Sequence, residues 1–191
     1  MFLNILLPTH SRVNELKMSL SSLMCQTDED WKATVILDFP EEGVRAKLLN
    51  VVHSFYDDRI EYIITDRRYN DWGHSLREIG KQNSYSEYLL MTGDDNYYTP
   101  NLVKELKIAA STKPGMIYWD MVHSHFNYSY FKCHPAHGYI DMGAFATRTE
   151  LAKQIPLTTN YAADGDFIED FKKKFPNEQM VKINKVLFTH N

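Results

Sequence analysis

Two carboxylates and an amide stand together at the end of an apolar run, in the segment 88–96. Asp94 and Asp95 are neighbours in sequence, so their charges repel unless a positive group lies between them. Mg²⁺ or Mn²⁺ meets this need, because such ions bind through one or two carboxylates together with substrate phosphates, and Asn96 adds a further oxygen. A solvated turn uses the same residue types, so the residues alone leave both interpretations open.

Other side chains suited to chemistry occur at similar boundaries. Asp38 directly follows the apolar run 34–37, and Asp164 and Asp166 open a helical stretch that runs to Phe175. A carboxylate beside a bound substrate can act as a general base, but either of these two aspartates could equally cap the helix. Near the last residue, a strand-like run ends in His190, whose imidazole is an acceptable Mn²⁺ ligand or else a plain surface group.

The elements that must position these residues alternate between strand-like and helix-like patterns. The strand-like runs are 3–7, 34–37, 60–64, 88–91 and 116–119. Between them, three stretches place apolar residues on one helical face: Leu16, Leu20 and Leu23; Val44, Leu48, Val51 and Phe55; Leu102, Leu106 and Ala109. Thr99 before Pro100 predicts a helix that begins there with a hydroxyl cap. Beyond residue 125 we expect antiparallel additions.

This alternation predicts an α/β fold with a mostly parallel, mixed central sheet flanked by helices on both faces. Ligands of such sheets bind beyond the carboxyl ends of the strands, where the acidic residues fall. At 191 residues, 43% of them hydrophobic, the chain is long enough for one core, so we expect a single domain over 1–191. The closeness of His190 to the last residue would fit a domain excised from a longer chain.

Composition and charge exclude several classes of protein. The net charge is −4 and no large basic block occurs, so we expect no nucleic-acid partner. The apolar runs are too short to cross a bilayer, so we expect no transmembrane segment. The two cysteines form no CxxC motif, which favours a reducing, cytoplasmic location over a disulfide framework.

Motifs of competing functions are missing or incomplete. The loop from Pro8 to Arg12 contains no glycine, which argues against a sugar-phosphate nucleotidyltransferase, a dinucleotide-binding enzyme and a phosphate-loop NTPase. A zinc site could be assembled from His123, His125, His137 and the pair Cys133-His134, but their spacing matches no compact motif. For the aromatic residues interleaved there, 126–131, we prefer a sugar- or acceptor-facing surface, with plain packing as the alternative. A non-catalytic nucleotide- or sugar-binding module stays open.

The order of these motifs resembles family 2-like glycosyltransferases of the GT-A fold over nearly the whole chain. The residues that carry the resemblance are segment 5–12, the acid at 38, segments 70–80 and 90–100, and Asp164. It implies that Pro8, Thr9 and Arg12 belong to a loop lining the nucleotide base. It also implies that Asp38 hydrogen-bonds the uracil or ribose and that Arg77 approaches the base.

The same resemblance assigns the remaining candidates. In that family an Asp-x-Asp motif binds the metal, and here Gly93-Asp94-Asp95-Asn96 stands in its place. Asp95 and Asn96 are then the expected metal ligands, completed by His190, while Asp94 contacts the ribose or supports the ligands; the division between the two aspartates stays open. The resemblance also implies that Asp141 holds sugar hydroxyls and that Asp164, with Asp166 as the second candidate, is the catalytic base of an inverting enzyme.

The implied function is the metal-dependent transfer of a hexose or deoxyhexose from a UDP-sugar to a glycan acceptor hydroxyl. The expected cofactor is Mn²⁺ or Mg²⁺, and the expected partners are the nucleotide sugar and the glycan. The chain further resembles the small glycosyltransferases that large algal (chlorella) viruses encode for capsid glycans. That resemblance implies glucose or rhamnose as the sugar and the host cytoplasm as the location.

Overall fold

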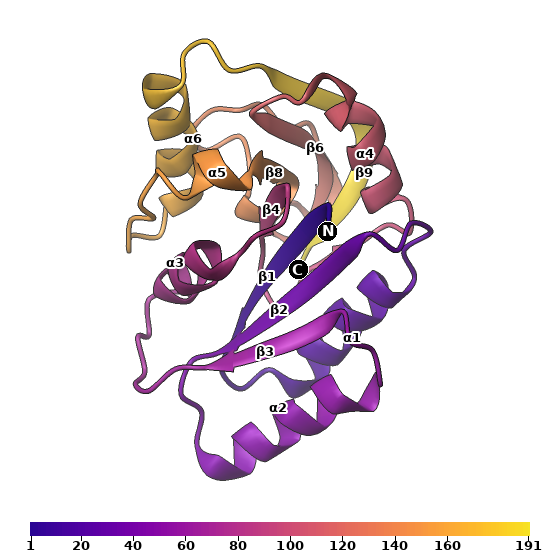
Figure 1. The fold of residues 1–191 in the computed structure, drawn as a ribbon, viewed down its shortest axis with the longest axis vertical. Helices are drawn as coiled ribbons and strands as arrows, with labels where there is room; N and C mark the ends of the chain where they lie inside the picture. The colour runs from indigo at the N-terminus through magenta and orange to yellow at the C-terminus, as the bar shows by residue number, and fades with distance from the viewer.

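A parallel half-sheet forms the first part of the molecule. The computed structural model describes residues 1–191, and its first four strands are β1 (Leu3–Thr9), β2 (Trp31–Leu37), β3 (Ile60–Ile64) and β4 (Tyr88–Met91). They lie in the order β3-β2-β1-β4, and all three pairings are parallel (Figure 1). All four predicted strands are confirmed, and β1 and β2 are longer than their apolar runs.

Three helices connect these strands, namely α1 (Val13–Met24), α2 (Glu42–Ser54) and α3 (His74–Asn83). The predicted face of α1 is confirmed, since Leu16, Leu20 and Leu23 are all buried. α3 lies close against the sheet at Gly80, where a Cβ would stand 2.5 Å from the Cδ1 of Ile36. This close approach positions the first turn of α3 beside the carboxyl ends of the strands.

The second half of the sheet is largely antiparallel. It adds β8 (Phe145–Arg148), β6 (Met116–His123), β9 (Met180–His190) and β5 (Tyr97–Tyr98) in that order, and β7 (Ser129–Phe131) pairs with β6. The expected antiparallel additions are therefore confirmed. The expectation of a mostly parallel sheet is wrong, because β8 inserts antiparallel between β4 and β6, and four of the eight strand pairings are antiparallel.

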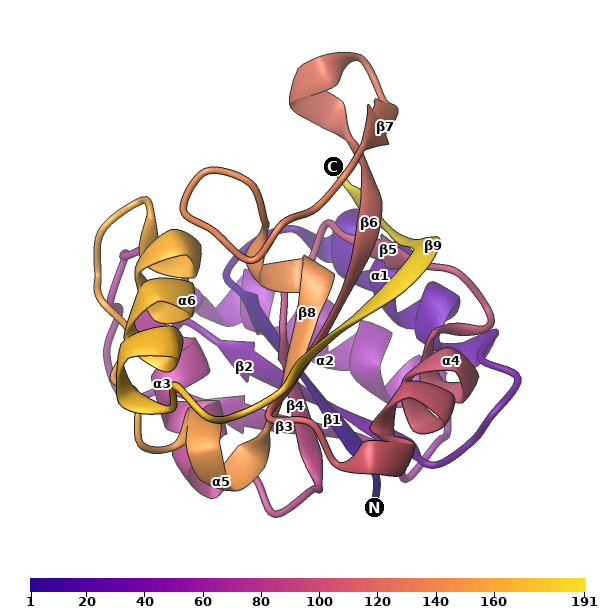
Figure 2. The same cartoon turned by 90° about the horizontal axis from the view of Figure 1, so that it is seen from above.

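The remaining helices are α4 (Leu102–Ala109), α5 (Thr149–Ala152) and α6 (Ala163–Lys174), with short 3₁₀ turns η1 (Ala110–Thr112), η2 (Ser124–Phe126) and η3 (Met142–Ala144). In Figure 2, α3, α5 and α6 gather on one side of the strands and α1 and α4 on the other, while β7 projects from the body with the end of β6. All seven residues of β1 are buried, so both faces of this central strand are covered. No helix combines the length and apolar character needed to cross a membrane.

The predicted helix cap at Thr99 is wrong. α4 begins at Leu102, and the Oγ1 of Thr99 is buried without a hydrogen-bond partner. The backbone of Thr99 is instead held by its surroundings, because its N–H donates to the carbonyl of Leu187 in β9 and its carbonyl accepts from Gln26 Nε2. Pairing with β9 thus delays the start of the helix by two residues, from Pro100 to Leu102.

Candidate active site

A cavity of about 590 Å³ opens at the carboxyl ends of β1, β2 and β4. Every residue predicted to bind the donor or the metal lines it: Pro8, Thr9, Arg12, Asp38, Arg77, Asp94, Asp95, Asn96, Asp141 and His190. The first eight lie at strand ends or in a helix start that a parallel sheet brings to one edge, whereas Asp141 precedes η3 and the antiparallel strand β8. The volume of this cavity lies in the range of small-molecule sites. We call it the donor cavity after the residues that were predicted to bind the donor.

Asp38 fastens the loop that follows β3. Its carboxylate accepts hydrogen bonds from the backbone N–H groups of Tyr69, at 2.7 Å, and Asn70, at 3.1 Å. The side chain is buried at the end of β2, and these two bonds satisfy its charge where water is excluded. Asp38 therefore shapes the cavity wall directly and through this loop.

Arg77 is buried in the first half of α3 and holds two segments together. Its Nε and Nη2 both donate to the carbonyl of Thr92, at 3.0 and 2.8 Å, and its Nη1 donates to the carbonyl of Trp72 at 2.9 Å. Burial lowers the pKa of Arg77, and the nearby Asp141 and Asp94 oppose this shift. The guanidinium thus anchors the end of β4 and contributes fixed positive charge beneath the cavity.

The two neighbouring aspartates after β4 share one cation. Arg12 Nη1 contacts the carboxylate of Asp95 and lies 3.6 Å from that of Asp94. Burial raises the pKa of Asp94 to about 6, and the charge of Asp95 adds to the effect. The positive group that the sequence requires between these carboxylates is therefore supplied here by the exposed guanidinium of Arg12.

A divalent cation fits this corner by the chemistry of its donor set. Asp94 and Asp95 present hard oxygen donors beside an open cavity, and Arg12 is a flexible surface side chain that can release them. The protein holds no cluster of three or more His, Cys, Asp or Glu side chains arranged as a metal site. Ions that complete their shell with substrate phosphates and water need only one or two protein carboxylates.

Asn96 connects Asn191, which follows β9, to the turn after β4 that carries Asp94 and Asp95. Its Nδ2 donates to Thr92 Oγ1 at 3.2 Å, and its Oδ1 accepts the backbone N–H of Asn191 at 3.3 Å. This bond, with the pairing of β9 on β5, brings His190 to the cavity wall. The imidazole of His190 lies 3.0 Å from Ser124 Oγ at Nδ1 and 3.8 Å from Asp141 Oδ2 at Nε2.

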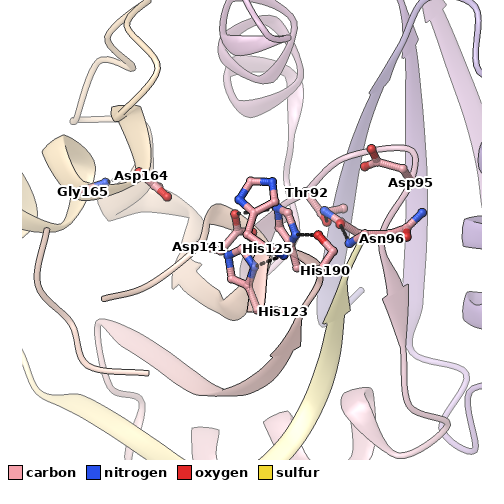
Figure 3. A network of polar contacts seen from close by, with 12 residues as sticks. Thr92, Asp95, Asn96, His123, His125, Asp141, Asp164, Gly165 and His190 are labelled. Carbon is pink, nitrogen blue, oxygen red and sulfur yellow. Dashed lines mark hydrogen bonds and ion pairs between the residues drawn. The ribbon is translucent and has the colours of Figure 1, made fainter. Parts of the chain in front are cut away.

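A second cavity of about 460 Å³ adjoins the first, and we call it the acceptor-side cavity. Trp72, Arg77, Asp141, Met142 and His190 line both cavities and form the wall between them. Figure 3 shows Asp141 and His190 between Asp164 on one side and Asn96 on the other.

Asp164 lies in the first turn of α6 and lines only the acceptor-side cavity. One carboxylate oxygen accepts the backbone N–H of Gly165 at 2.7 Å. Burial, and after it the charge of Asp141, raises the pKa of Asp164 to about 6. A half-buried carboxylate with a pKa of about 6 and a free oxygen is suited to remove a proton from a bound hydroxyl.

Asp166 lies apart from both cavities. Its Oδ2 accepts hydrogen bonds from Thr158 Oγ1 at 2.9 Å and Asn160 Nδ2 at 2.7 Å, and these bonds lower its pKa. The carboxylate thereby fastens the turn that leads into α6. Of the two aspartates that the sequence left open, the structure brings only Asp164 to a cavity.

The histidines predicted near the aromatic segment are divided by the fold. His123 and His125 gather with His190 at the acceptor-side cavity, with ring centroids 4.2 Å apart for His123 and His190 and 5.3 Å apart for His125 and His190 (Figure 3). Cys133 is buried and its backbone is bound to Asp120 and Lys182, while His134 lines neither cavity. The structure therefore does not assemble the zinc site considered from the sequence.

Several lining residues were not predicted as site residues. Among them are His10, Arg68, Asn70 and Trp72 in the donor cavity and Tyr161 in the acceptor-side cavity. Arg68, Asn70 and Trp72 come from a loop whose course depends on Asp38 and Arg77, and Tyr161 comes from a loop held by Asp166, dependences that no local pattern reveals. For Trp72 and Asn70 the backbone supplies a signal that the sequence hides, because both have positive φ, +56° and +53°.

Comparison with protein families matches residues 4–162 to glycosyl transferase family 2. Among solved structures, S. aureus TarS (residues 1–349) gives a TM-score of 0.82 at 13% identity, covering 100% of this chain and 60% of that one. The same protein in complex with UDP-GlcNAc gives 0.79 at 13% identity, covering 99% and 58%. The mannosyltransferase PcManGT from Pyrobaculum calidifontis, in complex with GDP-Man and Mn²⁺, gives 0.77 at 13% identity, covering 98% and 56%.

The chain thus spans about 60% of the first of these structures. At this identity the likeness establishes the fold, and it confirms the predicted α/β GT-A architecture. Comparison with curated protein sequences found no match. The expectations of a viral relative, a cytoplasmic location and a single domain over 1–191 stay predictions.

Proposed function

We propose a reaction for this chain from the premise that it belongs to glycosyl transferase family 2. The reaction is the transfer of a sugar from a UDP-sugar to a hydroxyl of a glycan acceptor, with inversion at the anomeric carbon. The observation that carries the proposal is the pair of adjoining cavities. One holds Asp38, Asp94 and Asp95, the other holds Asp164, and Asp141 lies in their common wall.

On the donor side, each residue has a role that its contacts support. Pro8, Thr9 and Asp38 border the region assigned to the nucleoside, and Asp38 also fixes the loop at Asn70. Arg12, whose side chain is 56% exposed, turns from Asp95 to the diphosphate when the nucleotide binds. A guanidinium suits this exchange, because it pairs equally well with carboxylate and phosphate oxygens.

The residues proposed to hold the divalent cation are Asp95, Asn96 and His190. The cation, when bound, supplies Lewis-acid stabilisation of the charge on the leaving diphosphate. Asp94, whose pKa is raised to about 6 by burial, stays a supporting residue or a ribose contact in this scheme.

On the acceptor side, Asp164 accepts the proton of the attacking hydroxyl. Its raised pKa brings it close to the operating pH, where a base is most effective, yet leaves it mostly ionised above neutrality. Asp141 lies at the boundary between the cavities, where it can accept hydrogen bonds from sugar hydroxyls through the oxygen not bound to Gly143. The hydroxyl attacks the face opposite the leaving group, so no covalent intermediate forms.

The test is nucleotide release and product analysis with the purified protein. UDP-glucose, UDP-N-acetylglucosamine and GDP-mannose are each incubated with Mn²⁺ and saccharide acceptors, and proton NMR identifies the anomer formed. We expect release of UDP and an inverted product. Asp95→Ala should abolish Mn²⁺-dependent release, whereas Asp57→Ala, which breaks an ion pair with Arg59 outside both cavities, should not.

Other outcomes would redirect the proposal. UDP binding without turnover by any donor would indicate the non-catalytic binding module. Release of GDP in place of UDP would overturn the assignment of the carrier. Undiminished release by Asp95→Ala would overturn the assignment of the metal ligand.

A further inference from the structure

The loop between β3 and α3 carries an exposed tryptophan in a strained backbone conformation. Trp72 has φ +56°, a region that bulky residues rarely adopt because it costs free energy. Its side chain is 65% exposed, so burial of the indole does not compensate for the cost. Such strain persists only where the surrounding structure determines it, and it is concentrated at functional sites.

The surrounding structure does determine the backbone conformation of Trp72, because hydrogen bonds on either side of this residue fix the loop. Arg77 Nη1 donates to the carbonyl of Trp72 at 2.9 Å, and Asp71 Oδ2 accepts from the backbone N–H and hydroxyl of Ser75 at 2.9 and 2.6 Å. The next residue, Gly73, packs on Pro8 so closely that a Cβ would stand 2.7 Å from the Cβ of the proline. The backbone of Trp72 is therefore held at the junction of the two cavities, both of which the residue lines.

A second exposed aromatic ring meets the indole from another loop. Tyr161, just before α6, is 74% exposed and lines the acceptor-side cavity. The ring centroids of Trp72 and Tyr161 are 6.1 Å apart, and their planes lie 77° to each other. Two exposed rings at nearly a right angle form a corner whose apolar faces can cover the apolar face of a sugar ring, leaving its hydroxyls to polar groups.

The permanent charges around this corner favour an uncharged ligand. The acceptor-side cavity contains two carboxylates, Asp141 and Asp164, and no lysine, together with five histidines. Its one arginine, Arg77, has its donors bound to backbone carbonyls. A phosphate or uronate group would approach fixed negative charge without a free strong cation to pair with.

We propose that Trp72 and Tyr161 form an acceptor platform on which an uncharged sugar ring of the acceptor lies, with its reacting hydroxyl directed to Asp164. This inference rests on the proposed function and narrows its acceptor to neutral glycans. It also assigns two specificity-determining residues on separate loops.

Intrinsic fluorescence offers a direct test, since the other two tryptophans, Trp31 and Trp119, are fully buried. Trp72 is then the only indole that acrylamide can readily quench. Methyl glycosides and short oligomers of glucose, mannose, galactose and rhamnose are titrated with and without saturating UDP and Mn²⁺, beside methyl glucuronide and a sugar phosphate. We expect a neutral saccharide to protect Trp72 from quenching and the two anionic probes to be without effect at the same concentration.

Variants identify the platform. Trp72→Gly removes the ring yet suits the positive φ, so the fold should persist. Because this variant lacks the reporter, saccharide binding is measured by saturation-transfer NMR. We expect affinity to fall on the order of tenfold for Trp72→Gly and for Tyr161→Ala, and to be largely retained in Trp72→Tyr. The matched control is Tyr56→Gly, which removes an even more exposed aromatic residue at φ +49° outside both cavities.

Each remaining outcome overturns either this inference or the proposed function, and UDP binding separates the two. If UDP binds while no neutral saccharide protects Trp72, or if an anionic probe binds better, the platform is refuted and the donor assignment stands. If Trp72→Gly weakens UDP binding as much as saccharide binding, Trp72 belongs to the donor site instead. If a saccharide binds through Trp72 and no nucleotide sugar binds, the proposed transferase function fails while the platform stands.

Discussion

Replacing Asp164 by asparagine should make the protein more stable and at the same time inactive. The carboxylate is half-buried, and its partial burial, with the charge of Asp141 after it, raises its pKa from 3.8 to about 6. A raised pKa for an acid means that the folded protein disfavours the ionised form. Asparagine keeps the oxygen that accepts the N–H of Gly165 and removes the charge. The folded state therefore becomes more stable relative to the unfolded chain, while the proposed base is lost.

The size of the effect follows from linkage. One pKa unit corresponds to 1.36 kcal/mol, so the change from 3.8 to about 6 amounts to about 3 kcal/mol. Because the cavity is open to water, we expect the gain in the free energy of unfolding to reach roughly 1–3 kcal/mol. For a chain of this length that corresponds to a rise of roughly 2–4 °C in Tm per kcal/mol. Loss of the base should lower transfer by about 10²–10⁴.

The pH dependence of the stability difference between the wild type and Asp164→Asn tests the direction of this effect. Below the unfolded pKa of 3.8 the carboxyl group is protonated in both states, so the wild type and Asp164→Asn should be equally stable. As pH rises through the window from 3.8 to about 6, the unfolded chain ionises first, and the wild type loses stability relative to the variant. Above that window the difference should be constant. This difference is measured by urea unfolding at pH 4 and pH 7.5, with the fluorescence of the buried Trp31 and Trp119 as the signal.

Asp166→Asn is the matched control in the same helical turn. Hydrogen bonds from Thr158 and Asn160 lower the pKa of Asp166, so this variant should lose a little stability at pH 7.5 and keep its transfer rate. The reasoning is refuted if Asp164→Asn transfers at the parent rate and melts lower, since the charge of Asp164 would then stabilise the N-terminus of α6 and take no part in transfer. Loss of transfer in Asp166→Asn alone would move the base to that residue.

Three further outcomes follow from the donor cavity. Asp38→Ala releases the loop at Asn70 and should weaken UDP binding, measured by calorimetry, by on the order of tenfold, with a circular dichroism spectrum like that of the parent. Gly73→Ala places a Cβ 2.7 Å from that of Pro8 at φ +82°, so urea unfolding should show a loss of about 1–3 kcal/mol; a loss below 0.5 kcal/mol would contradict the contact. Arg12→Ala should raise the affinity for Mn²⁺ alone, measured by electron paramagnetic resonance, while lowering that for UDP; unchanged Mn²⁺ affinity would show that Arg12 does not compete for Asp95.

Local sequence patterns were enough to predict the first half of the fold and the edge of the sheet where the donor cavity lies. Short apolar runs and amphipathic stretches depend on neighbouring residues, so β1 to β4 and the buried face of α1 could be predicted from local periodicity. The carboxyl ends of parallel strands necessarily share one edge. Asp38, Asp94 and Asp95 could therefore be grouped before their distances were known.

The order of the later strands and the different environments of the candidate residues depend on contacts between segments far apart in the sequence. The insertion of β8 between β4 and β6 depends on pairing between distant segments, which leaves no local pattern. The same holds for Asp164 and Asp166, which are equivalent as helix-opening acids in sequence but differ in the fold. Asp164 is half-buried within reach of the charge of Asp141, whereas Asp166 is hydrogen-bonded by Asn160. Burial and partner contacts set the pKa and the direction of a carboxylate, and both are properties of the assembled chain.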